Sequence, residues 1–156
     1  IYNRGISGDQ TVWALQRLDR IKESKPRKVF IMIGTNDLAV DRSPEDVANN
    51  IGRIVKELKT SSPETEIYVE SLFPVNGVDF VGKASKKSHW EKGDEIIATN
   101  RLLEKVCANE GATYIDIYSH LVDDRGLLNP AYTNDGLHLM YDGYAKWVSI
   151  LKPYME

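Results

Sequence analysis

Apolar residues follow two different periods along this chain, and the two periods alternate. Four short runs are rich in β-branched and aromatic residues, which is typical of β-strands. They cover residues 1–3, 28–34, 66–72 and 113–118. Elsewhere apolar residues recur every three or four positions, which indicates amphipathic helices. These helices are expected around residues 12–22, 47–58, 96–106 and 144–151.

Residues at the expected helix ends support this interpretation. Ser43 can cap the second helix, because Pro44 and two acidic residues follow it. Gly111 follows the third helix and is the expected C-cap. Asp9 precedes the first helix and is its expected N-cap.

Strands that alternate with helices of this length predict an α/β fold with a mostly parallel sheet and helices on both faces. In such folds the functional residues gather at the carboxyl ends of the strands. Polar, glycine-bearing clusters do follow the four predicted strands, at residues 3–11, 34–38, 71–77 and 134–139. A site at this edge of the sheet is therefore expected.

Composition narrows the possible partners. A length of 156 residues predicts one domain over residues 1–156, and the net charge of −3 with scattered Lys and Arg argues against nucleic acid. A small neutral or polar ligand fits better. No apolar run approaches the roughly twenty residues of a membrane span. Cys107 is the single cysteine, so an internal disulfide is excluded, and its helical position predicts a core residue.

The stretch NDGLHL holds the strongest candidate chemistry. Asp135 lies three residues before His138 with Gly136 between them, a spacing that suits a carboxylate orienting an imidazole base. His89 and His120 have no carboxylate in a comparable turn. The alternative interpretation is an acid and a histidine in an ordinary surface turn.

Two further clusters offer donors for a developing oxyanion. Asn36 follows the second predicted strand, and Gly5 lies in a glycine loop before the first helix. A side-chain amide and a free backbone N–H can both stabilise negative charge on oxygen. The alternative is that both clusters only turn or cap the chain.

Together these blocks resemble the SGNH, or GDSL-type, hydrolases over nearly all of the chain. NRGISGD matches the block that carries the family's glycine, at Gly5, and IGTNDL matches the asparagine block, at Asn36. DGLHL matches the final block, with Asp135 and His138 in the D-x-x-H pattern. The resemblance implies a three-layer α/β/α, flavodoxin-like fold and a serine esterase activity.

The family's nucleophile lies in a G-D-S or G-N-S motif, and neither triplet occurs here. The resemblance implies that about forty residues, with the serine and a central strand, precede residue 1, since a domain of this class is nearer two hundred residues. The domain is therefore expected to be N-terminally incomplete. Ser7 is a weak substitute because Asp9 stands where the elbow motif needs glycine. Ser71 is expected to make local hydrogen bonds.

By resemblance, the serine attacks an ester carbonyl, His138 is the base, Asp135 orients it, and Gly5 and Asn36 form the oxyanion hole. Asn76, His89 and Trp90 lie in the loop that follows the third strand and are candidate substrate-binding residues. Short acyl esters are expected, including O-acetyl groups on carbohydrate such as sialic acid.

No metal or cofactor is implied. The main alternative is a non-catalytic carbohydrate-binding relative, whereas a nucleotide-binding or signalling domain would need a phosphate loop or acidic cluster that this sequence lacks. The compartment stays open, and a secreted or periplasmic location is compatible with the sequence.

Overall fold

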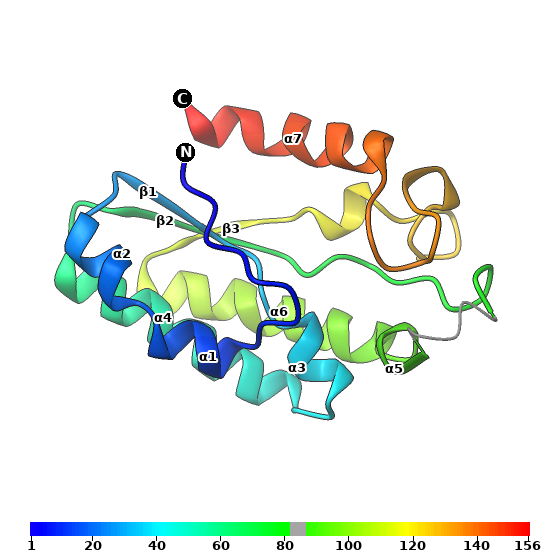
Figure 1. Cartoon of the computed structure of the whole chain (residues 1–156), viewed down its shortest axis with the longest axis horizontal. Helices are drawn as coiled ribbons and strands as arrows, with labels where there is room; N and C mark the ends of the chain where they lie inside the picture. The colour runs from blue at the N-terminus through cyan, green and yellow to red at the C-terminus, as the bar shows by residue number, and fades with distance from the viewer. Residues whose placement is uncertain (82–86) are drawn as a thin grey trace.

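The computed structural model describes residues 1–81 and 87–156 (Figure 1). Three parallel strands form one sheet in the order β1-β2-β3. Their bounds are Lys28–Ile31 for β1, Glu66–Glu70 for β2 and Thr113–Ile115 for β3. Helix α4 (Pro44–Ser61) connects β1 to β2, and α6 (Gly93–Glu110) connects β2 to β3. These helical crossovers make the strands parallel.

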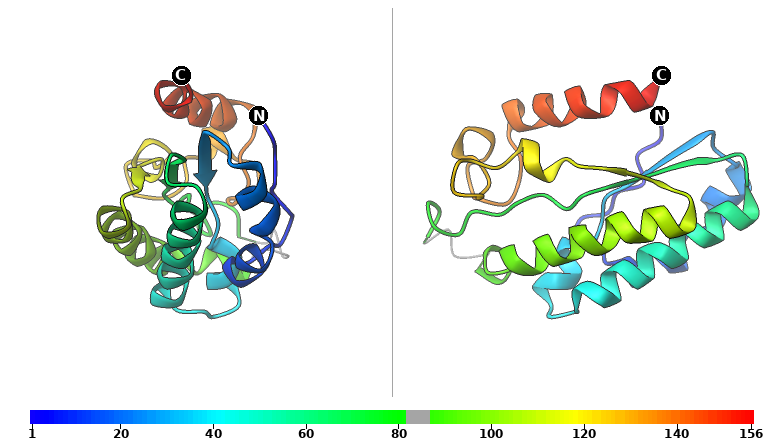
Figure 2. Two further views of the ribbon diagram at one scale, coloured as in Figure 1. Left: turned by 90° about the vertical axis from the view of Figure 1, so that its left-hand side faces the viewer. Right: turned by 180° about the vertical axis from the view of Figure 1, so that it is seen from behind.

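Helices cover the sheet on both faces (Figures 1 and 2). Helices α4 and α6 pack on one face, and α7 (Tyr141–Met155) lies over the other. Side chains of β2 alternate between the faces: Ile67 and Val69 belong to the core beneath α4 and α6, while Tyr68 packs with residues of α7. All three are buried. The predicted α/β/α layering is therefore confirmed.

The predicted caps of two long helices are present. Ser43 accepts a hydrogen bond from the Asp46 N–H at 3.1 Å, and the Asp46 carboxylate accepts one from the Ser43 N–H. Such a capping box satisfies N–H groups that a helix start leaves unpaired. Gly111 ends α6 in the left-handed conformation, with φ of 70°, which glycine adopts without steric cost.

Residues 1–3 do not form the predicted strand. Ile1 and Tyr2 are exposed, and β1 pairs only with β2 among the described residues. A strand needs a neighbouring strand to satisfy its backbone groups, and residues 1–3 pair with none of the described strands. Their composition is strand-like, but without a paired neighbour among the described residues they do not form a strand.

The first predicted helix is two short helices, α1 (Thr11–Gln16) and α2 (Asp19–Ser24). The chain bends between them, where Leu18 is buried in the core. The expected N-cap, Asp9, is also wrong, because Gln10 occupies that position. The Asp9 carboxylate instead binds the Arg17 guanidinium.

Several short elements connect the layers. The predicted turn after β1 is the short helix α3 (Thr35–Ala39), and α5 (Lys87–Trp90) precedes α6. Two 3-10 helices, Tyr118–His120 and Pro130–Tyr132, lie between β3 and α7. Helix α3 lies against α5, and this contact brings distant parts of the site together.

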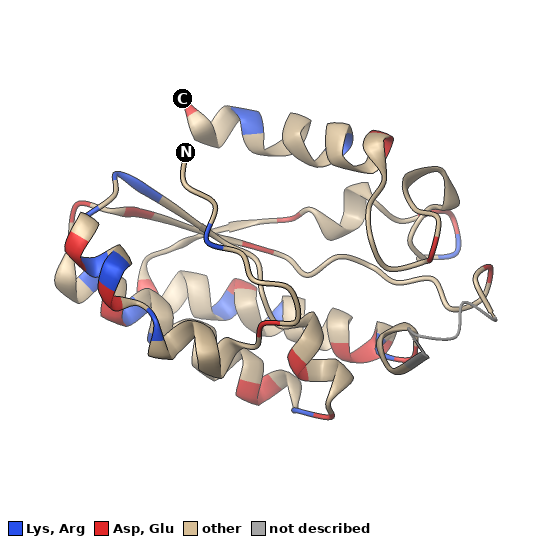
Figure 3. Ribbon diagram, viewed as in Figure 1, with Lys and Arg blue, Asp and Glu red and all other residues tan. Residues whose placement is uncertain are grey.

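Basic and acidic residues are interspersed over the helices (Figure 3). That the protein does not bind nucleic acid stays a prediction from the sequence. Among the described residues, none of the helices has the length and apolar character of a membrane span.

Candidate active site

Asp135 and His138 form a closely bonded pair on the loop before α7. The Asp135 Oδ2 atom lies 2.7 Å from His138 Nδ1. The other carboxylate oxygen, Oδ1, accepts the backbone N–H groups of Leu137 and His138 at 2.9 and 2.8 Å. One carboxylate therefore fixes both the backbone of the turn and the imidazole.

The sequence forms this turn through Thr133 and Gly136. Thr133 Oγ1 accepts the N–H groups of Asp135 and Gly136 at 3.3 and 2.9 Å. Gly136 has φ of +76°, and a Cβ on it would lie 2.2 Å from the Asn76 carbonyl oxygen. Only glycine fits this conformation and this contact.

The electrostatics suit a charged carboxylate beside a histidine. Burial raises the pKa of Asp135, but hydrogen bonds from the His138 side chain and from the N–H groups of His138 and Leu137 lower it overall, to about 2. The carboxylate is therefore ionised at neutral pH. Because Nδ1 of His138 is bound, Nε2 is the ring atom left for proton transfer, on a side chain that is 62% exposed.

Asn76 supports the turn from the interior. It is fully buried, and its N–H donates to the Gly136 carbonyl at 2.8 Å. Its side-chain amide donates to the Leu128 carbonyl and to Asp79, each at 2.9 Å. The side chain of Asn76, predicted to bind substrate, is thus occupied by these two bonds in the interior.

Asn36 lies in the first turn of α3, directly after β1 and Gly34. Its Nδ2 donates to the Asp9 carbonyl at 3.0 Å, and its Oδ1 lies 3.2 Å from His89 Nε2. A side-chain amide has two N–H groups, and the second has no protein acceptor among the described residues. That N–H is available to a ligand oxygen.

Helix α5 connects Asn36 with the turn of Asp135. His89 contacts the Asn36 amide, and the neighbouring Trp90 donates its Nε1–H to the Asp135 carbonyl at 3.0 Å. Trp90 packs so closely on Gly77 that a Cβ there would lie 2.7 Å from the Trp90 Cβ. These contacts thus link six of the seven predicted site residues: Asn36, Asn76, His89, Trp90, Asp135 and His138.

The remaining predicted donor, Gly5, lies apart from these contacts. It is exposed, and its N–H donates to Asn3 Oδ1 at 2.8 Å. Ser7 is exposed in the same segment.

Ser71 is fully buried, and its Oγ accepts the N–H groups of Ile117 and Tyr118 at 2.9 and 2.8 Å. Ser71 therefore makes hydrogen bonds within the fold, as expected, but to residues 46 and 47 positions away along the chain rather than to close neighbours.

Sequence reasoning missed Thr133 and did not foresee the bond from Trp90 to Asp135. The first had a visible signal, because a threonine before Asn-Asp-Gly is typical of a side-chain-capped turn. The second had none, since it depends on where α5 packs. The loop that holds the predicted substrate-binding residues Asn76, His89 and Trp90 includes residues 82–86, which lie outside the described part of the chain.

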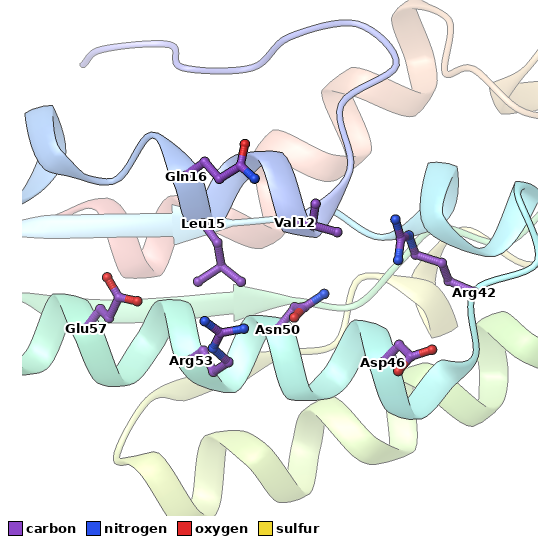
Figure 4. A pocket seen from close by; sticks show the side chains of 8 residues that line it. All are labelled: Val12, Leu15, Gln16, Arg42, Asp46, Asn50, Arg53 and Glu57. Carbon is purple, nitrogen blue, oxygen red and sulfur yellow. The ribbon is translucent and has the colours of Figure 1, made fainter.

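A separate open groove of about 430 Å³ lies between α1 and α4 (Figure 4). None of the predicted site residues lines it. Its lining residues are Val12, Leu15, Gln16, Arg42, Asp46, Asn50, Arg53 and Glu57. Within residues 1–81 and 87–156, no group of three or more His, Cys, Asp or Glu side chains is arranged to hold a metal ion.

Comparison with known proteins gives matches over most of the chain. The profile of the GDSL-like Lipase/Acylhydrolase family matches residues 1–146. The platelet-activating factor acetylhydrolase IB subunit alpha2 of Gallus gallus is 27% identical over 157 residues, covering 99% of this chain and 62% of that protein. An N-acylneuraminate cytidylyltransferase of Escherichia coli O18:K1:H7 is 32% identical over 119 residues, covering 74% of this chain. The chain spans 25% of that enzyme's length.

One solved structure, described as a platelet activating factor from Streptococcus pneumonia, superposes with a TM-score of 0.87. It is 29% identical to this chain and covers 100% of it, and the match covers 72% of that structure. The sheet and its helices are therefore arranged as in this relative.

Proposed function

Since the chain belongs to the GDSL-like lipase/acylhydrolase family, we propose that the protein hydrolyses short-chain carboxylic esters by a Ser-His-Asp mechanism. One observation carries the proposal: Asp135 holds His138 Nδ1 at 2.7 Å while His138 Nε2 is left for the reaction. A histidine oriented in this way can act as a general base.

The proposed reaction has two steps. A serine, which the family pattern places before residue 1, attacks the ester carbonyl while His138 Nε2 takes the hydroxyl proton. The tetrahedral intermediate collapses, the C–O bond to the alcohol breaks, and His138 gives the proton to the leaving oxygen. Water then attacks the acyl-enzyme with the same proton transfers and releases the acid. Asp135 stays ionised and stabilises the imidazolium throughout.

The second N–H of Asn36 is the proposed side-chain donor to the oxyanion. Losing one such donor typically raises the barrier by about 3 kcal/mol. We retain the Gly5 N–H as a second donor. For that role its present bond to Asn3 must be exchanged for one to the substrate oxygen.

For the substrate we propose short acyl groups, acetyl above all, on carbohydrate such as sialic acid. The name of the Gallus gallus relative, an acetylhydrolase, supports the acyl part. The name of the Escherichia coli relative, an N-acylneuraminate enzyme, supports sialic acid as the alcohol part.

The first test uses the full-length protein and a fluorophosphonate probe, which labels only an activated serine. We expect one label per chain on a serine before residue 1, and hydrolysis of p-nitrophenyl acetate faster than of the octanoate ester. His138→Ala should abolish both, while the exposed His120→Ala should retain them. An unlabelled, inactive protein would refute the esterase and favour a carbohydrate-binding relative without catalysis.

Release of acetate from O-acetylated sialic acid, compared with acetylated xylose, tests the alcohol part. A higher kcat/KM for the sialic acid ester is expected. Equal or reversed preference would refute that part while leaving the esterase proposal intact.

A further inference from the structure

We propose that His89 and Trp90, on helix α5, are positioning residues. They hold the Asn36 amide and the turn of Asp135 and His138 in a fixed position relative to each other. The proposal rests on the function proposed above. It gives these two side chains a different role from the substrate contacts expected from the sequence. Their contacts to Asn36 and Asp135 carry it.

The orientation of the Asn36 amide follows from its two neighbours. The Asp9 carbonyl can only accept a hydrogen bond, so the atom at 3.0 Å from it must be Nδ2. Oδ1 then faces His89 Nε2 at 3.2 Å. Because Oδ1 can only accept, His89 Nε2 must carry a proton. The Ser88 hydroxyl, 3.4 Å from His89 Nδ1, is placed to donate to the other ring nitrogen.

Two partners thus hold the amide plane, one on each side. With Oδ1 and one N–H fixed, the direction of the second N–H is fixed as well. Oxyanion stabilisation depends on donors that point at the developing charge before the reaction begins. Without His89, the amide can rotate about its last side-chain bond, and the second N–H loses its direction.

Trp90 joins helix α5 to the turn that carries the proposed base, His138. Its Nε1–H donates to the carbonyl of Asp135, the residue that orients His138. Its Cβ packs against Gly77, where no larger residue fits. A helix of one turn therefore contacts both halves of the site through adjacent residues, and small shifts between the halves are resisted. Misplacement by about 1 Å can reduce catalysis by about a hundredfold.

The test compares His89→Ala and His89→Gln in the full-length protein, each with Asn36 intact and with Asn36→Ala. With Asn36 intact, His89→Ala should lower kcat about tenfold while KM stays within about twofold. Glutamine can donate to the same oxygen, so His89→Gln should recover most of the rate. In the Asn36→Ala background His89→Ala should cause no further loss. His120→Ala is the matched control.

The outcomes separate the two proposals. Equal losses in both backgrounds, or a rise in KM alone, would overturn the positioning role of His89 and indicate a structural or substrate contact. A normal rate for Asn36→Ala would instead refute the proposed oxyanion role itself. Trp90→Phe keeps the ring and removes the N–H; we expect a loss of about threefold in kcat. Full activity would overturn the role of Trp90.

Discussion

Glu70 gives the sharpest quantitative prediction, because it is a carboxyl group in the interior with a single strong partner. It ends β2 on the face covered by α7, and 3% of it is exposed. Its Oε2 accepts the indole N–H of Trp147 at 2.6 Å. Burial raises the pKa of Glu70, the Trp147 bond lowers it in part, and the result is about 7 against an ordinary value of 4.5.

This pKa difference sets a free-energy cost of ionisation in the folded state. Each pKa unit corresponds to about 1.4 kcal/mol, so the full cost is about 3 kcal/mol. Below pH 4.5 Glu70 is protonated in both the folded and the unfolded state, and no cost arises. As pH rises from 4.5 to 7, the unfolded state loses its proton first, so the free energy of unfolding falls. Above pH 7 the whole cost is present.

Glu70→Gln keeps the shape and an acceptor for Trp147 but cannot ionise. The variant should match wild type near pH 4 and exceed its free energy of unfolding by up to about 3 kcal/mol at pH 8. Urea unfolding followed by circular dichroism, at half-unit steps from pH 4 to 8.5, measures the difference. The exposed Glu64→Gln is the control and should give a flat difference. A flat difference for Glu70→Gln as well would refute the reasoning.

Three further predictions concern the segments around the site. In urea unfolding, Gly136→Ala should lower the free energy of unfolding by at least about 2 kcal/mol more than Gly126→Ala. Both glycines have positive φ, but only at Gly136 would the added Cβ lie 2.2 Å from a backbone oxygen, that of Asn76. Equal losses would contradict this. Thr11→Val should cost about 1–3 kcal/mol by the same assay, because the buried Asp37 carboxylate loses the hydroxyl donor at 2.5 Å; an unchanged midpoint would contradict this. Ser7→Ala should keep most ester hydrolysis, and complete loss with an intact fold would make Ser7 the nucleophile.

The parts of the site that the sequence predicts well are local. Asp135 and His138 lie three residues apart around a glycine, so their contact depends on one turn and could be expected from spacing. Asn36 could be expected at the sheet edge because it follows a strongly apolar strand. Its hydrogen-bond partners, Asp9 and His89, could not be expected, since they lie 27 and 53 residues away along the chain.

Other features depend on tertiary packing that no local pattern encodes. Asn76 has a polar side chain in a loop, which favours exposure, yet its amide is held in the interior by hydrogen bonds to the Leu128 carbonyl and the Asp79 carboxylate. Residues 1–3 have strand-like composition, but a strand is defined by its neighbour. The break between α1 and α2 follows from burial of Leu18, which the helical period at that position does not reveal.

The turn of Asp135 and His138 has a consequence for how this fold can change over evolutionary time. The carboxylate binds the backbone and the imidazole of the same few residues, so the pair moves as a rigid cassette. Insertions elsewhere in the chain can leave these three bonds intact, provided that the contacts of the turn with Asn76 and Trp90 are kept. Moving this unit into another scaffold would require its supports from Asn76 and Trp90, a nucleophile, and an oxyanion donor at the right distance.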